Sequence, residues 1–252
     1  RGALPILPGV VVALMLGAGP MLQYGFDWLA YSNDDMVTYA LSGLRFMEHG
    51  LFDVPNLRAL QTNADASGTT WFVEVLPPSR FGSDVLLALL ASASHLDPVR
   101  AFMPACAVAF IGVVTATGAL ARATRLSRHG AAATAILIAA SPLTLLSVYY
   151  QLLPQILGIF EAVAFIALLP ATFDDATPPG RPITLGCIAA GLLLIYPELT
   201  AVFVPGAGIY FLVYLIRARR PVAPRIKSVA ILLGVICVLL NVQIFTLART
   251  FA

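Results

Sequence analysis

The side chains best suited to chemistry are two adjacent carboxylates, Asp34 and Asp35, within YSNDDMVTYALSGLRFMEHGLFD. A carboxylate pair can abstract a proton from a hydroxyl group, or its two members can share a divalent cation. The same residues also suit the first turn of a helix, where acids are favourable. The sequence leaves both readings open: a proton-abstracting or cation-binding pair, and a helix cap.

Further candidates lie among otherwise apolar residues. Glu198 follows Pro197 in IYPEL. Glu161 lies inside an apolar run, where an ionisable group is costly and usually faces a partner or a water-filled cavity, so we interpret it as structural or cavity-lining rather than catalytic. The stretch SVYYQLLPQ offers stacking rings and amides that can bind sugar hydroxyls, namely Tyr149, Tyr150 and Gln151. The alternatives are a loop carboxylate at Glu198 and an aromatic belt at the membrane interface for the two tyrosines.

Several kinds of chemistry have no support in the sequence. The three histidines are scattered without the spacing of metal ligands, and the three cysteines lie inside apolar runs. Neither GxxxxGK[ST] nor GxGxxG is present, so no nucleotide cofactor is expected. A divalent cation, if one is used, is expected at Asp34 and Asp35.

The elements that must position these residues are apolar helices. Of the 252 residues, 59% are hydrophobic and only 11% are charged, whereas soluble domains carry about 25% charged residues. The net charge is only +2, and the basic residues lie between the apolar runs, so nucleic-acid binding is not expected. The composition predicts an all-α, polytopic membrane protein in the lipid bilayer. Its long apolar runs are Leu4–Phe26, Ala101–Ala121, Ala131–Val148, Leu152–Leu169, Leu199–Ile216 and Val229–Leu247, with a shorter run at Ile183–Tyr196.

Basic loops orient these helices, because short cytoplasmic loops are rich in lysine and arginine. The basic segments are ARATRLSRHG and RARRPVAPRIK. Both fall inside if Gly82–Leu96 lies on the membrane surface as an interfacial or re-entrant helix, which its short apolar core favours. We therefore predict one transmembrane domain over 1–252 with seven crossings and a cytoplasmic N-terminus. It comprises a first helix at 4–26, an external loop at 27–100 and six helices at 101–252. Whether 183–196 spans fully stays open.

The external loop is the expected location of a site. It holds nine of the chain's thirteen acids, and long loops on rigid scaffolds tend to carry function. Within it, residues from Ser32 to Gly50 have the pattern of an N-capped amphipathic helix. Its expected apolar face comprises Met36, Tyr39, Ala40, Leu44 and Met47.

The order of these features resembles the GT-C superfamily of polytopic glycosyltransferases, such as protein mannosyltransferases and aminoarabinose transferases. The resemblance covers about Leu4 to Leu169. It rests on the acidic pair after the first helix, a helix ending in HG, Pro77–Pro78 before an apolar surface helix, HLDPVRAFMPA, ARATRLSR and the ending ASPL. It implies transfer of a sugar from a polyprenyl-phosphate donor, with Asp34 as the catalytic acid and Asp35 beside it. It further suggests Arg80 as a phosphate contact; the alternative is a surface arginine that anchors the interfacial helix.

The chain departs from the family pattern at SVYYQLLPQ, where many members carry a second acid. Glu198, on the same predicted side as Asp34, is a candidate replacement. The resemblance predicts a membrane enzyme at the external face of a bacterial cytoplasmic membrane, as a portion of a longer protein. The missing acid favours one alternative, a non-catalytic membrane subunit that contacts a membrane-protein partner. The other alternative is a transporter or lipid-handling protein, with Glu161 and Glu198 lining a pathway.

Overall fold

All regular secondary structure in the described part of the chain is helical. The computed structural model describes residues 4–27, 35–50, 53–74, 81–172, 178, 180–217, 223–241 and 243. The all-α prediction is confirmed for these residues. The α-helices are α1 (Leu7–Gly17), α2 (Gly19–Tyr24), α3 (Asp35–Glu48), α4 (Leu57–Gln61), α5 (Thr69–Glu74), α6 (Gly82–Ser94), α7 (Pro98–Ala123), α8 (Arg128–Ala139), α9 (Pro142–Tyr149), α10 (Leu153–Thr172), α11 (Gly180–Ile195), α12 (Thr200–Arg217) and α13 (Ala223–Leu240). Three short 3-10 turns are η1 (Leu4–Ile6), η2 (Ala66–Gly68) and η3 (Pro197–Leu199).

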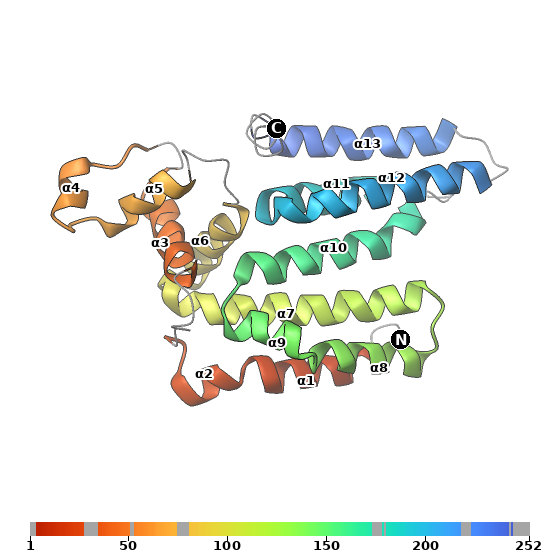
Figure 1. Ribbon diagram of the computed structural model, residues 1–252, viewed down its shortest axis with the longest axis horizontal. Coiled ribbons are helices and arrows are strands. Elements are labelled where there is room, and N and C mark those ends of the chain that lie inside the picture. The colour runs from red at the N-terminus through yellow and green to blue at the C-terminus, as the bar shows by residue number, and fades with distance from the viewer. Residues whose placement is uncertain are drawn as a thin grey trace.

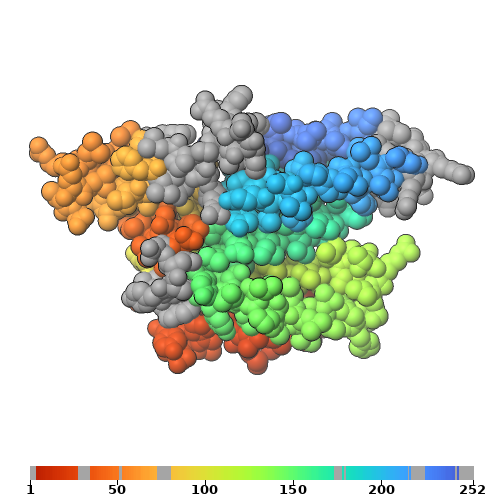
Figure 2. Space-filling view, viewed as in Figure 1, coloured from red at the N-terminus to blue at the C-terminus, as the bar shows by residue number. Residues whose placement is uncertain are grey.

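The long helices form a bundle with roughly parallel axes (Figure 1). Along the chain, α1–α2, α7, α8–α9, α10, α11, α12 and α13 run in alternating directions (Figure 1). Helices α3 to α6 lie at one end of this bundle, where they form a projecting lobe (Figure 2). Every second connection of the bundle therefore lies at the lobe end, and the others lie at the opposite end.

Two of the apolar runs are interrupted at proline. The run Leu4–Phe26 contains two helices, and Pro20, which has no amide hydrogen, stands in the first turn of the second helix. The run Ala131–Val148 is bent by 45° between α8 and α9, which begins at Pro142. Pro142 cannot donate to the carbonyl of Ile138 four residues earlier. The hydroxyl of Thr144 donates to that carbonyl instead, at 2.6 Å.

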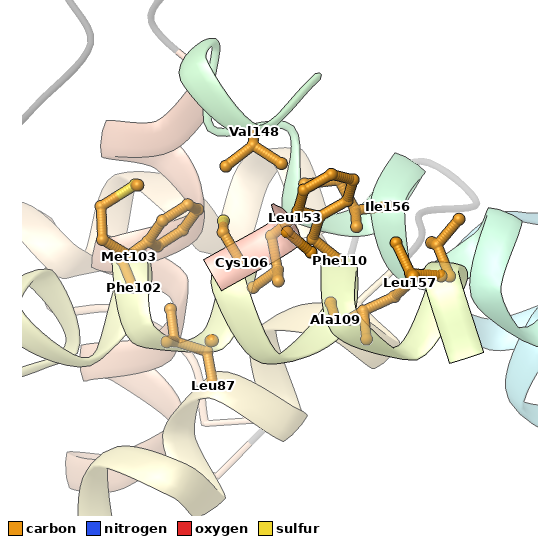
Figure 3. Close-up of a cluster of buried hydrophobic side chains, with 14 of the residues drawn as sticks. Leu87, Phe102, Met103, Cys106, Ala109, Phe110, Val148, Leu153, Ile156 and Leu157 are labelled. Carbon is orange, nitrogen blue, oxygen red and sulfur yellow. The ribbon is translucent and has the colours of Figure 1, made fainter. Parts of the chain in front are cut away.

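Helix α7 forms the centre of the larger hydrophobic core. Phe102, Cys106 and Phe110 on this helix are almost fully buried. Figure 3 shows them close to side chains of α6, α9 and α10, namely Leu87, Val148, Leu153, Ile156 and Leu157. Leu87 lies on the lobe helix α6, so the lobe shares this core with the bundle.

Glycines allow the bundle helices to approach closely. A Cβ added to Gly9 of α1 would lie 2.6 Å from Cβ of Ala135 in α8. A Cβ added to Gly158 of α10 would lie 2.6 Å from Cβ of Tyr196, which follows α11. Small residues at helix contacts are typical of helix packing in membranes, where close van der Waals contact replaces the hydrophobic driving force.

Three described helical segments are long and apolar enough to cross a membrane: Pro98–Ala123, Leu153–Thr172 and Pro197–Tyr214. The bent pair Arg128–Ala139 and Pro142–Tyr149 raises the number to four if it is one span. Shorter apolar helices are Leu4–Gly17, Gly82–Ser94 and Gly180–Ile195. These helices are typical of a membrane protein, and the seven crossings and the external side of the lobe stay predictions.

The last helix begins earlier than the apolar run that predicted it. The run starts at Val229, whereas α13 extends from Ala223 to Leu240 and includes Arg225 and Lys227. Arg225 is buried, and its guanidinium carbon lies 4.8 Å from the centre of the Tyr214 ring. This cation–π contact offsets part of the cost of burying the charge. The end of the predicted run, from residue 244 to Leu247, lies outside the described residues.

Candidate functional site

The lobe end of the bundle collects polar residues from segments that are distant in the sequence. Helix α6 packs on α3, on the start of α7 and on the end of α11. A Cβ added to Gly82 would lie 2.8 Å from Cγ1 of Ile195 and 2.9 Å from the carbonyl oxygen of Leu194. The first turn of α6 and the last turn of α11 are therefore in direct contact. This contact brings the segments that carry Asp84 and Glu198 to the same end of the bundle.

Asp35 is the first residue of α3 and is exposed. The next residue, Met36, is buried. The start of α3 faces the start of α7 across a pocket of about 140 Å³ whose lining includes Met36, Ala40, Asp97 and Pro98. Asp35 thus begins a helix that is fixed by its apolar face, with its own side chain at the surface. Asp34 and Arg80, the other two residues implied by the family resemblance, lie outside the described residues.

The buried face of α3 differs in part from the predicted face. Met36, Tyr39 and Ala40 are buried as expected, whereas Leu44 is half-buried and Met47 is exposed. The face is rotated because Ser42, Gly43 and Arg45 also pack inward. A Cβ on Gly43 would lie 3.2 Å from Leu87 of α6. Contact with α6 thus selects small side chains on a face that hydrophobicity alone would not identify.

Asp84 is the buried acid of this end, and the sequence argument did not single it out. It lies in the first turn of α6 and is 1% exposed. The hydroxyl of the fully buried Ser83 donates to its Oδ1 at 3.0 Å. A helix N-terminus stabilises negative charge, and a buried carboxylate needs such support. The sequence signal that could have identified Asp84 is its position directly before the apolar stretch VLLALL. That helix was expected to lie on the membrane surface.

The three candidates at the turn between α9 and α10 have different environments. The hydroxyl of Tyr149 donates to the carbonyl of Leu16 at 2.8 Å and so links α9 to α1. Tyr150 is 38% exposed, whereas Gln151 is fully buried with a φ of 56°. The left-handed backbone of Gln151 makes the sharp turn into α10. Of the three side chains, Tyr150 is the most accessible to a ligand.

Glu198 and Glu161 occupy separate places. Glu198 is exposed in η3, at the lobe end, where the chain passes from α11 to α12. Glu161 lies eight residues into α10, about 12 Å along the helix from its start. A Cβ added to Gly191 of α11 would lie 2.6 Å from Oε1 of Glu161, so this glycine makes room for the carboxylate. Its Oε2 is buried and accepts no hydrogen bond from the described residues.

A hydrogen-bond network stabilises the outer part of the lobe. The buried Arg45 donates to the carbonyl oxygen of Asp53, and Nδ1 of His49 lies 3.0 Å from Oδ2 of the same residue. Asp65 accepts hydrogen bonds from the Ser67 hydroxyl at 2.6 Å and from the Gly68 amide at 3.2 Å. The Ser67 hydrogen bond is the main reason why the pKa of Asp65 lies below its ordinary value of 3.8.

Basic side chains occupy the opposite end of the bundle. Arg122 and Arg128 flank the connection from α7 to α8, and Arg225 lies in the first turn of α13, after the connection from α12 (Figure 1). Within the described ranges, no three His, Cys, Asp or Glu side chains lie close enough together to hold a metal ion. The arrangement therefore separates an acidic end, with the lobe, from a basic end.

Comparison of the chain with family models, curated proteins and solved structures finds no match.

Proposed function

We propose that the chain is the membrane portion of a GT-C-like glycosyltransferase that transfers a sugar from a polyprenyl-phosphate donor to an acceptor. The observation that carries the proposal is the collection of acids at one end of the bundle. Asp35 of α3, Asp84 of α6 and Glu198 of η3 come from separate segments, and the contact between Gly82 and the end of α11 joins two of those segments.

The membrane orientation follows from the opposite end. In the proposal, α1–α2, α7, α8–α9, α10, α11, α12 and α13 are the seven crossings, and the basic end is cytoplasmic by the positive-inside rule. The lobe then lies at the external face of the cytoplasmic membrane. Helix α11 is about 24 Å long, which is shorter than a bilayer core of about 30 Å. In the proposal α11 nevertheless crosses the membrane, since it packs along its length against α10 and α13.

The proposed reaction assigns different roles to the acids. Asp34, assisted by Asp35, removes the proton of an acceptor hydroxyl, whose oxygen then bonds to the anomeric carbon of the donor sugar. The bond between that carbon and the phosphate oxygen breaks, and the lipid phosphate leaves with both electrons. Arg80 neutralises the departing phosphate. The buried Asp84 helps to fix the start of α6, four residues after Arg80.

Two candidates for sugar binding lie on neighbouring connections at the same end. Tyr150 offers an exposed ring, and Glu198 an exposed carboxylate, both near the ends of bundle helices. Aromatic rings stack on sugar faces, and carboxylates accept hydrogen bonds from sugar hydroxyls. Many family members carry their second acid in the stretch that corresponds to SVYYQLLPQ, and Glu198 lies outside it. The proposal therefore gives Glu198 a role in binding the sugar. If a divalent ion takes part, Asp34 and Asp35 would be its first ligands, and the ion would neutralise the charge of the phosphate.

The experiment is a measurement of donor turnover by the full-length protein in nanodiscs. Release of polyprenyl phosphate from a panel of lipid-linked sugars is compared between wild type, Asp34→Asn and Asp97→Asn. Asp97 is the matched control, because its carboxylate accepts a hydrogen bond from the Val99 amide at 2.8 Å as an N-cap, a role that asparagine keeps.

We expect turnover to fall at least about a hundredfold in Asp34→Asn, as for the loss of a general base. Turnover in Asp97→Asn should stay near wild type. Binding of the donor without turnover in all three proteins would contradict the enzyme assignment and favour a non-catalytic subunit. Absence of donor binding by a folded protein would favour the transport alternative.

A further inference from the structure

Helices α1 and α8 form a pocket at the basic end of the bundle. Both helices begin at this end and pack side by side (Figure 1). The pocket between their first turns has a volume of about 350 Å³. It is lined by three residues of η1 and α1 and by three of α8, namely Leu4, Pro5, Pro8, Arg128, His129 and Ala132. We call it the α1–α8 pocket.

Two close contacts position the walls of the α1–α8 pocket. A Cβ added to Gly9 would lie 2.6 Å from Cβ of Ala135, so α1 and α8 touch directly beyond the pocket. Ile6 is buried, and a Cβ added to Gly118 of α7 would lie 2.9 Å from its Cγ1. Because Ile6 points inward, Leu4 on the pocket side stays 70% exposed. Core packing therefore holds both walls in place.

Two basic side chains line the α1–α8 pocket without a protein partner. Arg128 and His129 are exposed, and neither side chain forms a hydrogen bond or an ion pair in the described part of the chain. In contrast, Arg122 at the end of α7 donates to a backbone carbonyl at 2.7 Å. Residues 1–26 and 98–160, which include all the elements around the pocket, contain no Asp or Glu. These elements therefore supply no carboxylate to balance the two basic groups.

Beyond the pocket, the outer faces of both helices are apolar. Met15 of α1 is 69% exposed and Leu137 of α8 is 72% exposed. Residues 2–26 and 130–160 contain no Asp, Glu, Lys, Arg or His. In a bilayer, acyl chains cover such faces, and the headgroups of the same lipids then lie level with the pocket. The two basic side chains thus meet a lipid phosphate.

We infer that the α1–α8 pocket binds the phosphate of an anionic phospholipid whose acyl chains lie along α1 and α8. Arg128 can hold two phosphate oxygens at once, and His129 can donate a further hydrogen bond. Basic pockets between transmembrane helices on the cytoplasmic side recognise anionic headgroups. A zwitterionic headgroup fits less well, because its ammonium group would lie beside Arg128. The site is independent of the proposed transfer reaction, whose acids lie at the opposite end.

Matched variants test both the charge and the space of the pocket. Arg125 is exposed in the connection before α8 and does not line the pocket, so Arg125→Gln is the control for Arg128→Gln. Ala132→Leu places a side chain in the pocket, and Ala133→Leu places the same side chain on the exposed surface outside it. The full-length protein is delipidated in detergent. Native mass spectrometry then measures binding of dioleoyl phosphatidylglycerol, dioleoyl phosphatidylcholine and the soluble sn-glycerol 3-phosphate, and thermal unfolding confirms that each variant is folded.

Wild type should bind one phosphatidylglycerol at least about fivefold more tightly than phosphatidylcholine. Arg128→Gln should weaken phosphatidylglycerol about fivefold, since one basic residue near an anionic headgroup contributes on that scale, and Arg125→Gln should have a smaller effect. Ala132→Leu should weaken the same binding, and Ala133→Leu should keep it. Equal binding of the two phospholipids, or equal losses in Arg125→Gln and Arg128→Gln, would overturn the inference. Binding of sn-glycerol 3-phosphate as tightly as phosphatidylglycerol would overturn the lipid assignment.

Discussion

The contact between α6 and α11 is the structural link on which the candidate site depends, and one glycine tests it. In Gly82→Ala the new Cβ would lie 2.8 Å from Cγ1 of Ile195 and 2.9 Å from the carbonyl carbon of Leu194. Carbon atoms in favourable contact are about 3.5–4.0 Å apart, so α6 has to move by about 0.7 Å or more. The backbone of Leu194 cannot rotate away as a side chain would.

We expect Gly82→Ala to destabilise the protein by about 1–3 kcal/mol, the range for an overpacked contact. For a chain of this size that corresponds to a Tm lower by about 2–12 °C. Gly180→Ala is the matched control, because Gly180 is also the first residue of its helix and an added Cβ there meets no atom within 4 Å. The control should be neutral or slightly stabilising, since alanine has fewer conformations to lose on folding than glycine.

The assay is thermal unfolding of both variants in the same detergent, followed by circular dichroism at 222 nm. A second readout is donor turnover, which should fall in Gly82→Ala because Asp84 moves with the start of α6. A Gly82→Ala protein that is as stable as Gly180→Ala would refute the close packing of α6 on α11, and with it the basis for a shared site.

Three further predictions concern the stability of variants in and beside the lobe. Leu87→Ala should cost about 2–5 kcal/mol because Leu87 is fully buried, whereas Leu89→Ala on the same helix should cost less than about 1 kcal/mol because Leu89 is 62% exposed. Equal losses in denaturant unfolding would contradict the packing of α6. Ser67→Ala should raise the pKa of Asp65 towards its ordinary value. A pKa lowered by folding stabilises the protein above about pH 4, and this contribution is lost as the pH falls through the folded-state pKa. The Tm difference between wild type and Ser67→Ala should therefore be present at pH 7 and shrink below pH 4; a difference that is constant from pH 7 to pH 2 would count against the hydrogen bond. Arg100→Gln removes an exposed ion pair of 2.9 Å with Asp27 and should change stability by less than about 1 kcal/mol, less again in 1 M salt; a larger loss in the melting curve would mean that the pair is not a surface contact.

Hydrophobicity alone was sufficient to predict most of the bundle. The run Ala101–Ala121 became α7, which is longer at both ends. The run Leu152–Leu169 became α10, which begins one residue later and ends three residues later. Interruptions were harder to predict, because they depend on partners in space. At the 45° bend before Pro142, the carbonyl of Ile138 accepts hydrogen bonds from the Thr144 hydroxyl and the Ser141 amide in place of the missing proline amide.

The start of α13 could not be read from apolarity for a related reason. Arg225 is buried in the first turn of the helix, and the ring that contacts its guanidinium group, that of Tyr214, comes from the preceding helix. A pattern along one segment carries no information about such a contact. The predicted start at Val229 was therefore six residues late.

At the candidate site, the sequence identified residue types better than environments. Asp35 does begin a helix, but the buried acid of the lobe is Asp84, which stands in a helix that the pattern assigned to the membrane surface. Tyr149 looked like a ligand-binding residue, and its hydroxyl is bonded to Leu16. In both cases the environment of the side chain depends on a neighbouring helix that is distant in the sequence.

The central claim is that the acidic lobe end faces the outside and the basic end faces the cytoplasm. Single cysteines at Gln61 in the lobe and at Arg128 at the basic end, both exposed positions, test it directly in a background in which Cys106, Cys187 and Cys237 are replaced by alanine. Labelling with a membrane-impermeant maleimide is compared in intact and permeabilised bacterial cells. The account predicts that Gln61→Cys reacts in intact cells and that Arg128→Cys reacts only after permeabilisation. The reverse pattern, or labelling of both positions in intact cells, would contradict it.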